Sequence, residues 1–161
     1  MRILAVDPGF ERVGIAVVET TSRERMHLLA YSECFRTPKE QPFPERLAAI
    51  GKEIERVIGA YAPEILAIEA LYFNTNKKTA LRVAEARGVI IREAERGGLK
   101  VSEYTPPQVK IALTGYGRAS KAQVAAMVEQ LIRIPEKKAR LDDEFDAIAI
   151  GLTHAAHNQR G

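Results

Sequence analysis

Short apolar runs predict three strands at the start of the chain. Residues 2–7 and 12–19 are rich in valine and isoleucine, and Pro8 with Gly9 marks a turn between them. Residues 26–35 form a third run of the same kind. Because only short segments connect the three runs, we expect an antiparallel meander.

The spacing then changes to the 3.6-residue period of a helix. Apolar residues from Leu47 to Tyr61 follow this period behind the start signals Pro42 and Pro44. After this amphipathic helix, residues 64–69 form a short apolar run that predicts a buried strand.

The middle of the chain predicts a parallel crossover. Residues 78–96 have a long helical pattern that ends at Gly97 and Gly98, and residues 99–104 read as a strand. Two strands separated by a helix are typically parallel and joined by a right-handed connection. Three shorter helices are predicted in the remainder, over residues 106–113, 120–133 and 143–157.

These elements predict an α/β fold. The expected sheet is mixed and five-stranded, with three antiparallel strands followed by two parallel ones, and helices flank it. At 161 residues, the chain fits a single domain spanning 1–161.

Composition bears on the compartment in which the protein acts and on the kinds of partner that it binds. No apolar run approaches the roughly 20 residues of a membrane span, and the start lacks the pattern of a signal peptide, so we expect a cytoplasmic protein without a membrane partner. Cys34 is the only cysteine, which excludes an internal disulfide, and we expect a small buried side chain in a strand. The net charge of +3 is too small to establish a nucleic-acid partner by itself.

Four carboxylates stand out against this background. Asp7 and Glu69 close two apolar strands, and Asp143 and Asp146 lie three residues apart at the start of a helix. Asp143 and Asp146 share one helix face, and Asp7 and Glu69 would be adjacent if the first and fourth strands are neighbours. A buried, unpaired carboxylate costs several kcal/mol, so a cation should balance the group.

A hard divalent metal is the simplest cation for such a set. Carboxylate oxygens suit Mg²⁺ or Mn²⁺, and shared carboxylates can hold two ions about 4 Å apart. Metal pairs of this kind hydrolyse phosphodiesters, so the sequence favours a nuclease.

Other interpretations exist for single residues. Asp7 alone could be a turn residue, and Asp142 with Asp143 could cap the last helix. The segment around Asp7 also resembles the first phosphate loop of actin-like sugar kinases, but the chain lacks the second loop and second domain that those proteins need.

Four segments together resemble the RuvC family of bacterial Holliday junction resolvases: DPGFERVGIAV, IEALYFNTNKKTALRVAEARGVI, YTPPQVKIALTGYGRASKAQVAAMV and DDEFDAIAIGLTHA. The resemblance runs nearly end to end. It implies a ribonuclease-H-like fold, a homodimer, and Mg²⁺-dependent cleavage of two opposed strands at a four-way DNA junction during recombination and repair. It also implies the branch-migration proteins RuvA and RuvB as partners, and two Mg²⁺ ions per active site, with Mn²⁺ as a substitute.

The family's metal-binding carboxylates correspond to the same four residues, Asp7, Glu69, Asp143 and Asp146. Lys121 is expected to act in catalysis beside them. The sequence leaves open whether Asp142, Glu144 or His154 assists the metal site. We expect His154 and His157 to be exposed or helix-end residues and not ligands.

The expected DNA contacts lie in two segments. Lys110 and Arg118 belong to or flank the glycine-rich loop LTGYGRAS, and the resemblance places the Lys110 position near the scissile phosphate. The second segment follows Glu69 and holds two aromatics, suited to stacking on an unpaired base, and two lysines: Tyr72, Phe73, Lys77 and Lys78. Core packing remains an alternative for the aromatics. The resemblance implies that helix 78–96 contributes to the dimer interface, and packing against the core alone is the alternative for its small residues.

Two other functions compete with the resolvase. The first is a module that binds branched DNA without cleaving it, which would gain nothing from four anions near phosphate. The second is a ribonuclease-H-like nuclease that acts on RNA or on linear duplex. Metal-dependent cleavage separates the resolvase from the first, and substrate preference separates it from the second.

Overall fold

The structure is a computed structural model that describes residues 1–20, 26–71, 77–134 and 142–158, with only the backbone described at residues 77 and 78. Within these residues the elements follow in the order β1 (Arg2–Asp7), β2 (Arg12–Glu19), β3 (His27–Arg36), α1 (Phe43–Tyr61), β4 (Ile65–Glu69), α2 (Lys77–Arg96), β5 (Lys100–Tyr104), α3 (Pro106–Thr114), α4 (Lys121–Leu131), β6 (Ile132–Arg133) and α5 (Asp142–Asn158). None of the described helices is long and apolar enough to cross a membrane.

The strands form one mixed sheet in the order β5-β4-β1-β2-β3-β6. The first three strands pair antiparallel, and β4 and β5 continue the sheet parallel to β1. This confirms the expected α/β class, the meander and the neighbouring position of β1 and β4. The pairing of Val6 with Ile68 brings the ends of those two strands to the same edge of the sheet.

A sixth strand corrects the predicted five. The helix expected over residues 120–133 ends at Leu131, and Ile132–Arg133 pair in parallel with His27 and Leu28 of β3. Two residues are too few to show an alternating pattern, so only their pairing with β3 defines them as a strand.

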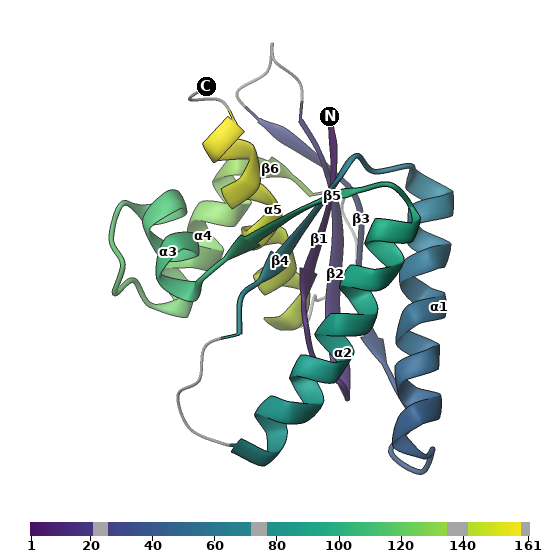
Figure 1. The fold of residues 1–161 in the computed structure, drawn as a ribbon. Helices are drawn as coiled ribbons and strands as arrows, with labels where there is room; N and C mark the ends of the chain where they lie inside the picture. The colour runs from purple at the N-terminus through teal and green to yellow at the C-terminus, as the bar shows by residue number, and fades with distance from the viewer. Residues whose placement is uncertain (21–25, 72–76, 135–141, 159–161) are drawn as a thin grey trace.

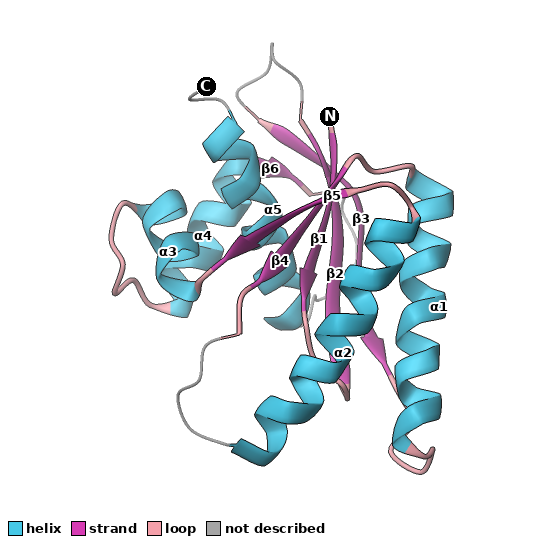
Figure 2. Ribbon diagram, viewed as in Figure 1, coloured by secondary structure: helices cyan, strands magenta, loops and turns pink. Residues whose placement is uncertain are grey.

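Helices cover both faces of the sheet, as Figures 1 and 2 show. The helices α1 and α2 lie on one face, and α3, α4 and α5 lie on the other. Alternation along the strands divides their side chains between two apolar cores. In β1, for example, Leu4 and Val6 face α1 and α2, whereas Ile3 and Ala5 face α5.

Small residues allow α5 to pack closely on the centre of the sheet. Ala5 and Ala16 form part of the surface under the helix. A Cβ added at Gly151 of α5 would lie 2.7 Å from Val18 Cγ2, which is closer than real contacts allow. This close packing fixes how near α5 lies to the sheet, and therefore where its first turn meets the ends of β1 and β2.

Candidate active site

The four carboxylates gather at one edge of the sheet. Asp7 ends β1, Glu69 ends β4, and Asp143 and Asp146 lie in the first two turns of α5. The pKa of Asp7 is raised to about 8, chiefly by burial and then, in decreasing order, by the charges of Glu69, Asp146 and Asp143, while Lys121 opposes the increase. All three of the other acids are therefore close enough to act on Asp7.

The pKa of Glu69 is raised for similar reasons. Its pKa is raised to about 6, chiefly by burial and then by the charge of Asp146, while Lys121 opposes the increase. Each ionised carboxylate thus makes the ionisation of its neighbours harder, so the folded protein carries an electrostatic strain that a bound cation would relieve.

The donor set fits a hard cation better than a soft one, because carboxylate oxygens predominate. Within the described part of the chain, however, no three acidic, histidine or cysteine side chains already stand in the arrangement of a metal cage. Side-chain rotation at this edge would have to bring the oxygens together around an ion.

Arg46 of α1 anchors the turn that follows Asp7. Arg46, which is buried, donates hydrogen bonds to Thr37 Oγ1 at 2.8 Å and to the Phe10 carbonyl at 3.1 Å. Thr37 also donates to that carbonyl at 2.6 Å, and the Arg46 guanidinium lies over the Phe10 ring. These contacts anchor the backbone that carries Asp7.

The end of β4 is held by α2 and β5. Arg87 Nε donates to the Glu69 carbonyl at 3.2 Å. Its Nη2 lies 2.5 Å from Glu103 Oε2, an ion pair and not an aligned hydrogen bond. On the other side, Ala70 donates its N–H to the Tyr104 carbonyl at 2.9 Å. Glu69 therefore projects from a fixed backbone.

The start of α5 rests on β2 and β3. A Cβ at Gly14 would lie 2.0 Å from the Asp143 carbonyl oxygen, so only glycine leaves room for the helix. Asp143 Oδ2 lies 3.4 Å from Arg12 Nε and accepts a hydrogen bond from Cys34 Sγ at 3.6 Å. Burial and the neighbouring Asp143 charge raise the pKa of the thiol. The expected buried Cys34 is in fact partly exposed and lies in this site.

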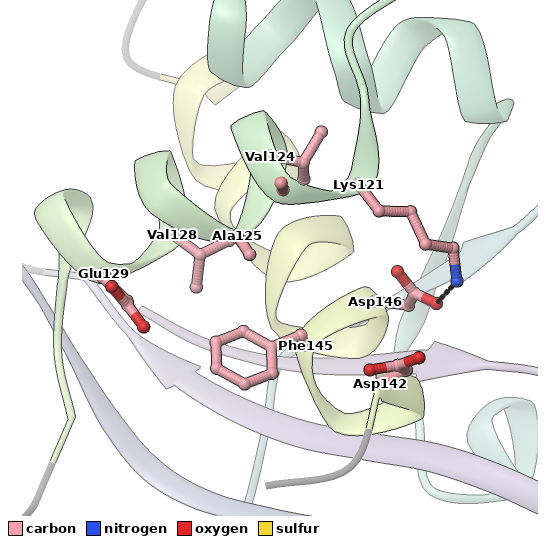
Figure 3. A pocket seen from close by; sticks show the side chains of 9 residues that line it. Lys121, Val124, Ala125, Val128, Glu129, Asp142, Phe145 and Asp146 are labelled. Carbon is pink, nitrogen blue, oxygen red and sulfur yellow. Dashed lines mark hydrogen bonds and ion pairs between the residues drawn. The ribbon is translucent and has the colours of Figure 1, made fainter.

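Lys121 contributes a cation from the start of α4. Its Nζ lies 3.3 Å from Asp146 Oδ2, and Figure 3 shows the side chain reaching across to that carboxylate. The pKa of Lys121 is raised, chiefly by Asp146. Ser120 and Gln123 form a capping box that defines where α4 begins, and so where the lysine projects.

A cavity of about 350 Å³ opens beside this ion pair, between α4 and the first turns of α5 (Figure 3). Its wall is apolar where Val124, Val128 and Phe145 meet, and charged towards Lys121 and the acids of α5. The cavity therefore joins the candidate site along one side.

The remaining predicted residues differ in how far the structure describes them. Lys110 is partly buried in the middle of α3, and Arg118 is exposed in the loop before α4. Tyr72 and Phe73 lie outside the described residues, and Lys77 and Lys78 are described only as the backbone that begins α2.

The sequence left open whether Asp142, Glu144 or His154 assists the metal site, and the structure places these three side chains in different surroundings. Asp142 is exposed beside the cavity, and Glu144 accepts a hydrogen bond from Ser32 at 2.8 Å. The expectation of an exposed or helix-end His154 is wrong, because the side chain is 5% exposed. Its Nδ1 lies 2.8 Å from the Tyr104 hydroxyl and its Nε2 accepts from Asn158 at 2.6 Å, so the ring belongs to the core.

Sequence reasoning missed several residues that shape the site: Arg12, Gly14, Arg46 and Arg87. Each acts through strand register or through a helix distant in sequence. One signal in the sequence could have identified Gly14: it follows Asp7 by seven residues across a tight turn, which places the two residues opposite each other.

A mixed sheet of this order, with acids at the ends of β1 and β4 and at the start of a helix packed across them, defines an α/β nuclease of the ribonuclease-H-like class. The model of the family "Crossover junction endodeoxyribonuclease RuvC" matches residues 3–154. The chain therefore belongs to the RuvC family of Holliday junction resolvases, as the sequence resemblance implied.

Individual relatives agree over nearly the whole chain. The crossover junction endodeoxyribonuclease RuvC of Moorella thermoacetica is 45% identical over 156 residues, which are 97% of this chain and 92% of that relative. The T. thermophilus RuvC solved in complex with Holliday junction substrate is 32% identical, with a TM-score of 0.92 and coverage of 100% of this chain and 96% of that one. The yeast mitochondrial Holliday junction resolvase Ydc2, at 15% identity and a TM-score of 0.69, shares the fold.

Proposed function

We propose that the candidate site cleaves a four-way DNA junction by a two-metal mechanism, with Asp7, Glu69, Asp143 and Asp146 as the metal ligands. The observation that carries the proposal is the placement of these four acids at the adjacent ends of β1 and β4 and at the start of α5, where burial and the other three acids raise the pKa of Asp7 to about 8. Four mutually repelling carboxylates at a solvent-facing edge favour a bound dication, and Mg²⁺, with Mn²⁺ as its substitute, suits their oxygens.

Two bound ions would supply an activated water and charge neutralisation at the departing 3′ oxygen. The protein's own groups act around that chemistry. The backbone anchors at Phe10 and Glu69 hold Asp7 and Glu69 at the ends of neighbouring strands. Lys121, paired with Asp146, would offset negative charge that develops on the scissile phosphate.

The DNA strand would be held by cations and aromatics around this edge. We assign phosphate contacts to Lys110, Arg118, Lys77 and Lys78, and base stacking to Tyr72 and Phe73. The assignments of Lys110 and Tyr72 follow positions matched to the family, and the other four rest on the charge or aromatic character of the side chain.

Resolution of a junction requires two cuts, and we propose a homodimer of single-domain protomers that provides two equivalent sites. RuvA and RuvB are the proposed partners that deliver the junction, and the cytoplasm is the proposed location. A T. thermophilus relative in complex with junction substrate supports the choice of DNA.

The test compares a synthetic four-way junction with a linear duplex of the same sequence. Wild type and Asp7→Asn are incubated with each substrate in Mg²⁺ or in EDTA, and binding is measured in parallel with Ca²⁺. Paired nicks on the junction alone, dependent on Mg²⁺, are expected for the wild type. Asp7→Asn should bind the junction at least as tightly, because one repelling anion is gone, and should not cleave it.

Two results would reject the proposal. Equal cleavage of the linear duplex would indicate a general nuclease, and a junction that is bound but never cut with any metal would indicate a binding module. Loss of binding in Asp7→Asn, with unchanged melting temperature, would remove Asp7 from the metal site.

A further inference from the structure

Two arginines face each other at the open end of the β2–β3 hairpin. Arg12 begins β2, Arg36 ends β3, and the strand register pairs them directly. Like charges at directly opposed positions of antiparallel strands are destabilising, because their side chains lie close together. The pair therefore needs a reason beyond the stability of the sheet.

The existing partners do not neutralise the pair. Arg12 Nε lies 3.4 Å from Asp143 Oδ2, and its side chain is 54% exposed. Arg36 is exposed and lowers the pKa of the neighbouring Cys34 thiol, and no carboxylate forms an ion pair with it among residues 1–20, 26–71, 77–134 and 142–158. If Asp143 binds a cation, its negative charge is largely neutralised, and Asp143 is the only carboxylate within those residues that forms an ion pair with Arg12.

The pair also lies on the same face and edge as the candidate site. Asp7 is opposite Gly14, and Gly14 is opposite Cys34. Arg12 precedes Gly14 by two residues and Arg36 follows Cys34 by two, so both side chains point to the face that carries Asp7 and lie nearer the ends of their strands. The contact between Arg12 and Asp143 agrees with this placement.

We infer that Arg12 and Arg36 form a phosphate-binding pair that holds the backbone of the cleaved DNA strand beside the carboxylates. A guanidinium presents several donors in a plane and matches a phosphate in a bidentate way. An anion between the two side chains would also remove their mutual repulsion. The inference rests on the proposed function, since it takes junction DNA as the polyanion.

DNA accounts for this arrangement better than a small anion does. The neighbouring acids repel a free anion, whereas a DNA strand engaged at the site carries further phosphates along its length past the acids. Contacts to phosphate position a strand without reading its sequence, so the pair should act on affinity and register and not on base preference.

Arg36→Gln is the decisive variant, because it removes one positive charge without breaking an ion pair of the described structure. We expect junction affinity, measured with Ca²⁺ at several salt concentrations, to fall by about 3- to 10-fold, and the slope of log K against log salt to fall by about one. The melting temperature of the free protein should stay the same or rise, because the like-charge contact is gone. In the double variant with Arg12→Gln, the slope of log K against log salt should fall by about one more.

Lys52→Gln is the matched control, since Lys52 is an exposed cation on α1, which lies on the opposite face of the sheet. It should leave the salt slope unchanged. Arg36→Lys should restore most of the slope but only part of the affinity, because an ammonium lacks the planar fork of donors.

An unchanged salt slope in Arg36→Gln would overturn the inference, as would a lower melting temperature accompanied by full junction affinity, which would make the pair a structural element. Failure of the wild type to bind the junction would instead reject the proposed function. The two failures are therefore distinguishable.

Discussion

Lys121 Nζ lies 3.3 Å from Asp146 Oδ2 and so connects the first residue of α4 to a carboxylate of α5. The Lys121 side chain is 77% exposed, and an ion pair as exposed as this contributes little to stability. Its position beside a candidate metal ligand points to a role in the reaction instead.

Replacing Lys121 by alanine should therefore affect turnover and not folding. We expect kcat on a four-way junction to fall by about 10²-fold or more, because a cation at the phosphate acts mainly on the charge of the transition state. Junction affinity should fall less, and the melting temperature should change little. Lys52→Ala serves as the control for the loss of an exposed lysine. Equal losses in kcat and in affinity would make Lys121 a DNA-holding residue only.

The raised pKa of Asp7 predicts a pH-dependent stability of the metal-free protein. Between the ordinary value of 3.8 and about 8, the folded protein retains a proton at Asp7 that the unfolded chain releases. The free energy of unfolding therefore falls as pH rises through this window. Glu69 adds a smaller decrease between 4.5 and about 6.

Asp7→Asn should remove most of this decrease. In EDTA, its melting temperature should match that of the wild type near pH 4 and exceed it by at least about 3 °C at pH 8. Mg²⁺ should narrow the difference at pH 8 by stabilising only the wild type. Melting curves of the two proteins that run parallel from pH 4 to pH 8 would mean that Asp7 ionises without strain.

Gly14→Ala tests the contact between β2 and the start of α5. The added Cβ would meet the Asp143 carbonyl oxygen, so α5 must shift. We expect a loss of about 1–3 kcal/mol in the free energy of unfolding, together with weaker cleavage, since Asp143 moves with the helix. Denaturant unfolding and junction cleavage measure the two effects.

Gly59→Ala provides the control for that substitution. Gly59 is exposed in α1 and a Cβ there would meet nothing within 4 Å, so the variant should gain about 0.5–1 kcal/mol and cleave normally. A Gly14→Ala protein that is as stable as the wild type would show that α5 does not rest on β2 in this way.

The proposed dimer can be tested at Gly88 of α2. Gly88 is exposed in the protomer and a Cβ there would meet nothing within 4 Å, so helix propensity alone predicts that Gly88→Ala stabilises the protomer. If α2 packs closely on a second copy, the same methyl should weaken the dimer by about 10-fold or more. Sedimentation at several concentrations measures this, with Gly59→Ala as the control. An unchanged dissociation constant would place the interface away from Gly88.

Local patterns in the sequence determined the strands β1 to β5, the five helices and the identity of the four acids. Periods of 2 and 3.6 are visible wherever an element buries one face, and an acid that ends an apolar run, as Asp7 and Glu69 do, is conspicuous without any structure. The sequence also determined the family, because four ordered segments carry it across nearly the whole chain.

Only the tertiary structure decided what surrounds the acids. The two residues of β6 are a strand because β3 is beside them, and Cys34 and Arg12 belong to the site because strand register places them beside Asp143 in the first turn of α5. His154 became a core residue through Tyr104, a partner fifty positions away. Contacts of this kind depend on how distant segments pack, and no periodicity within one segment records them.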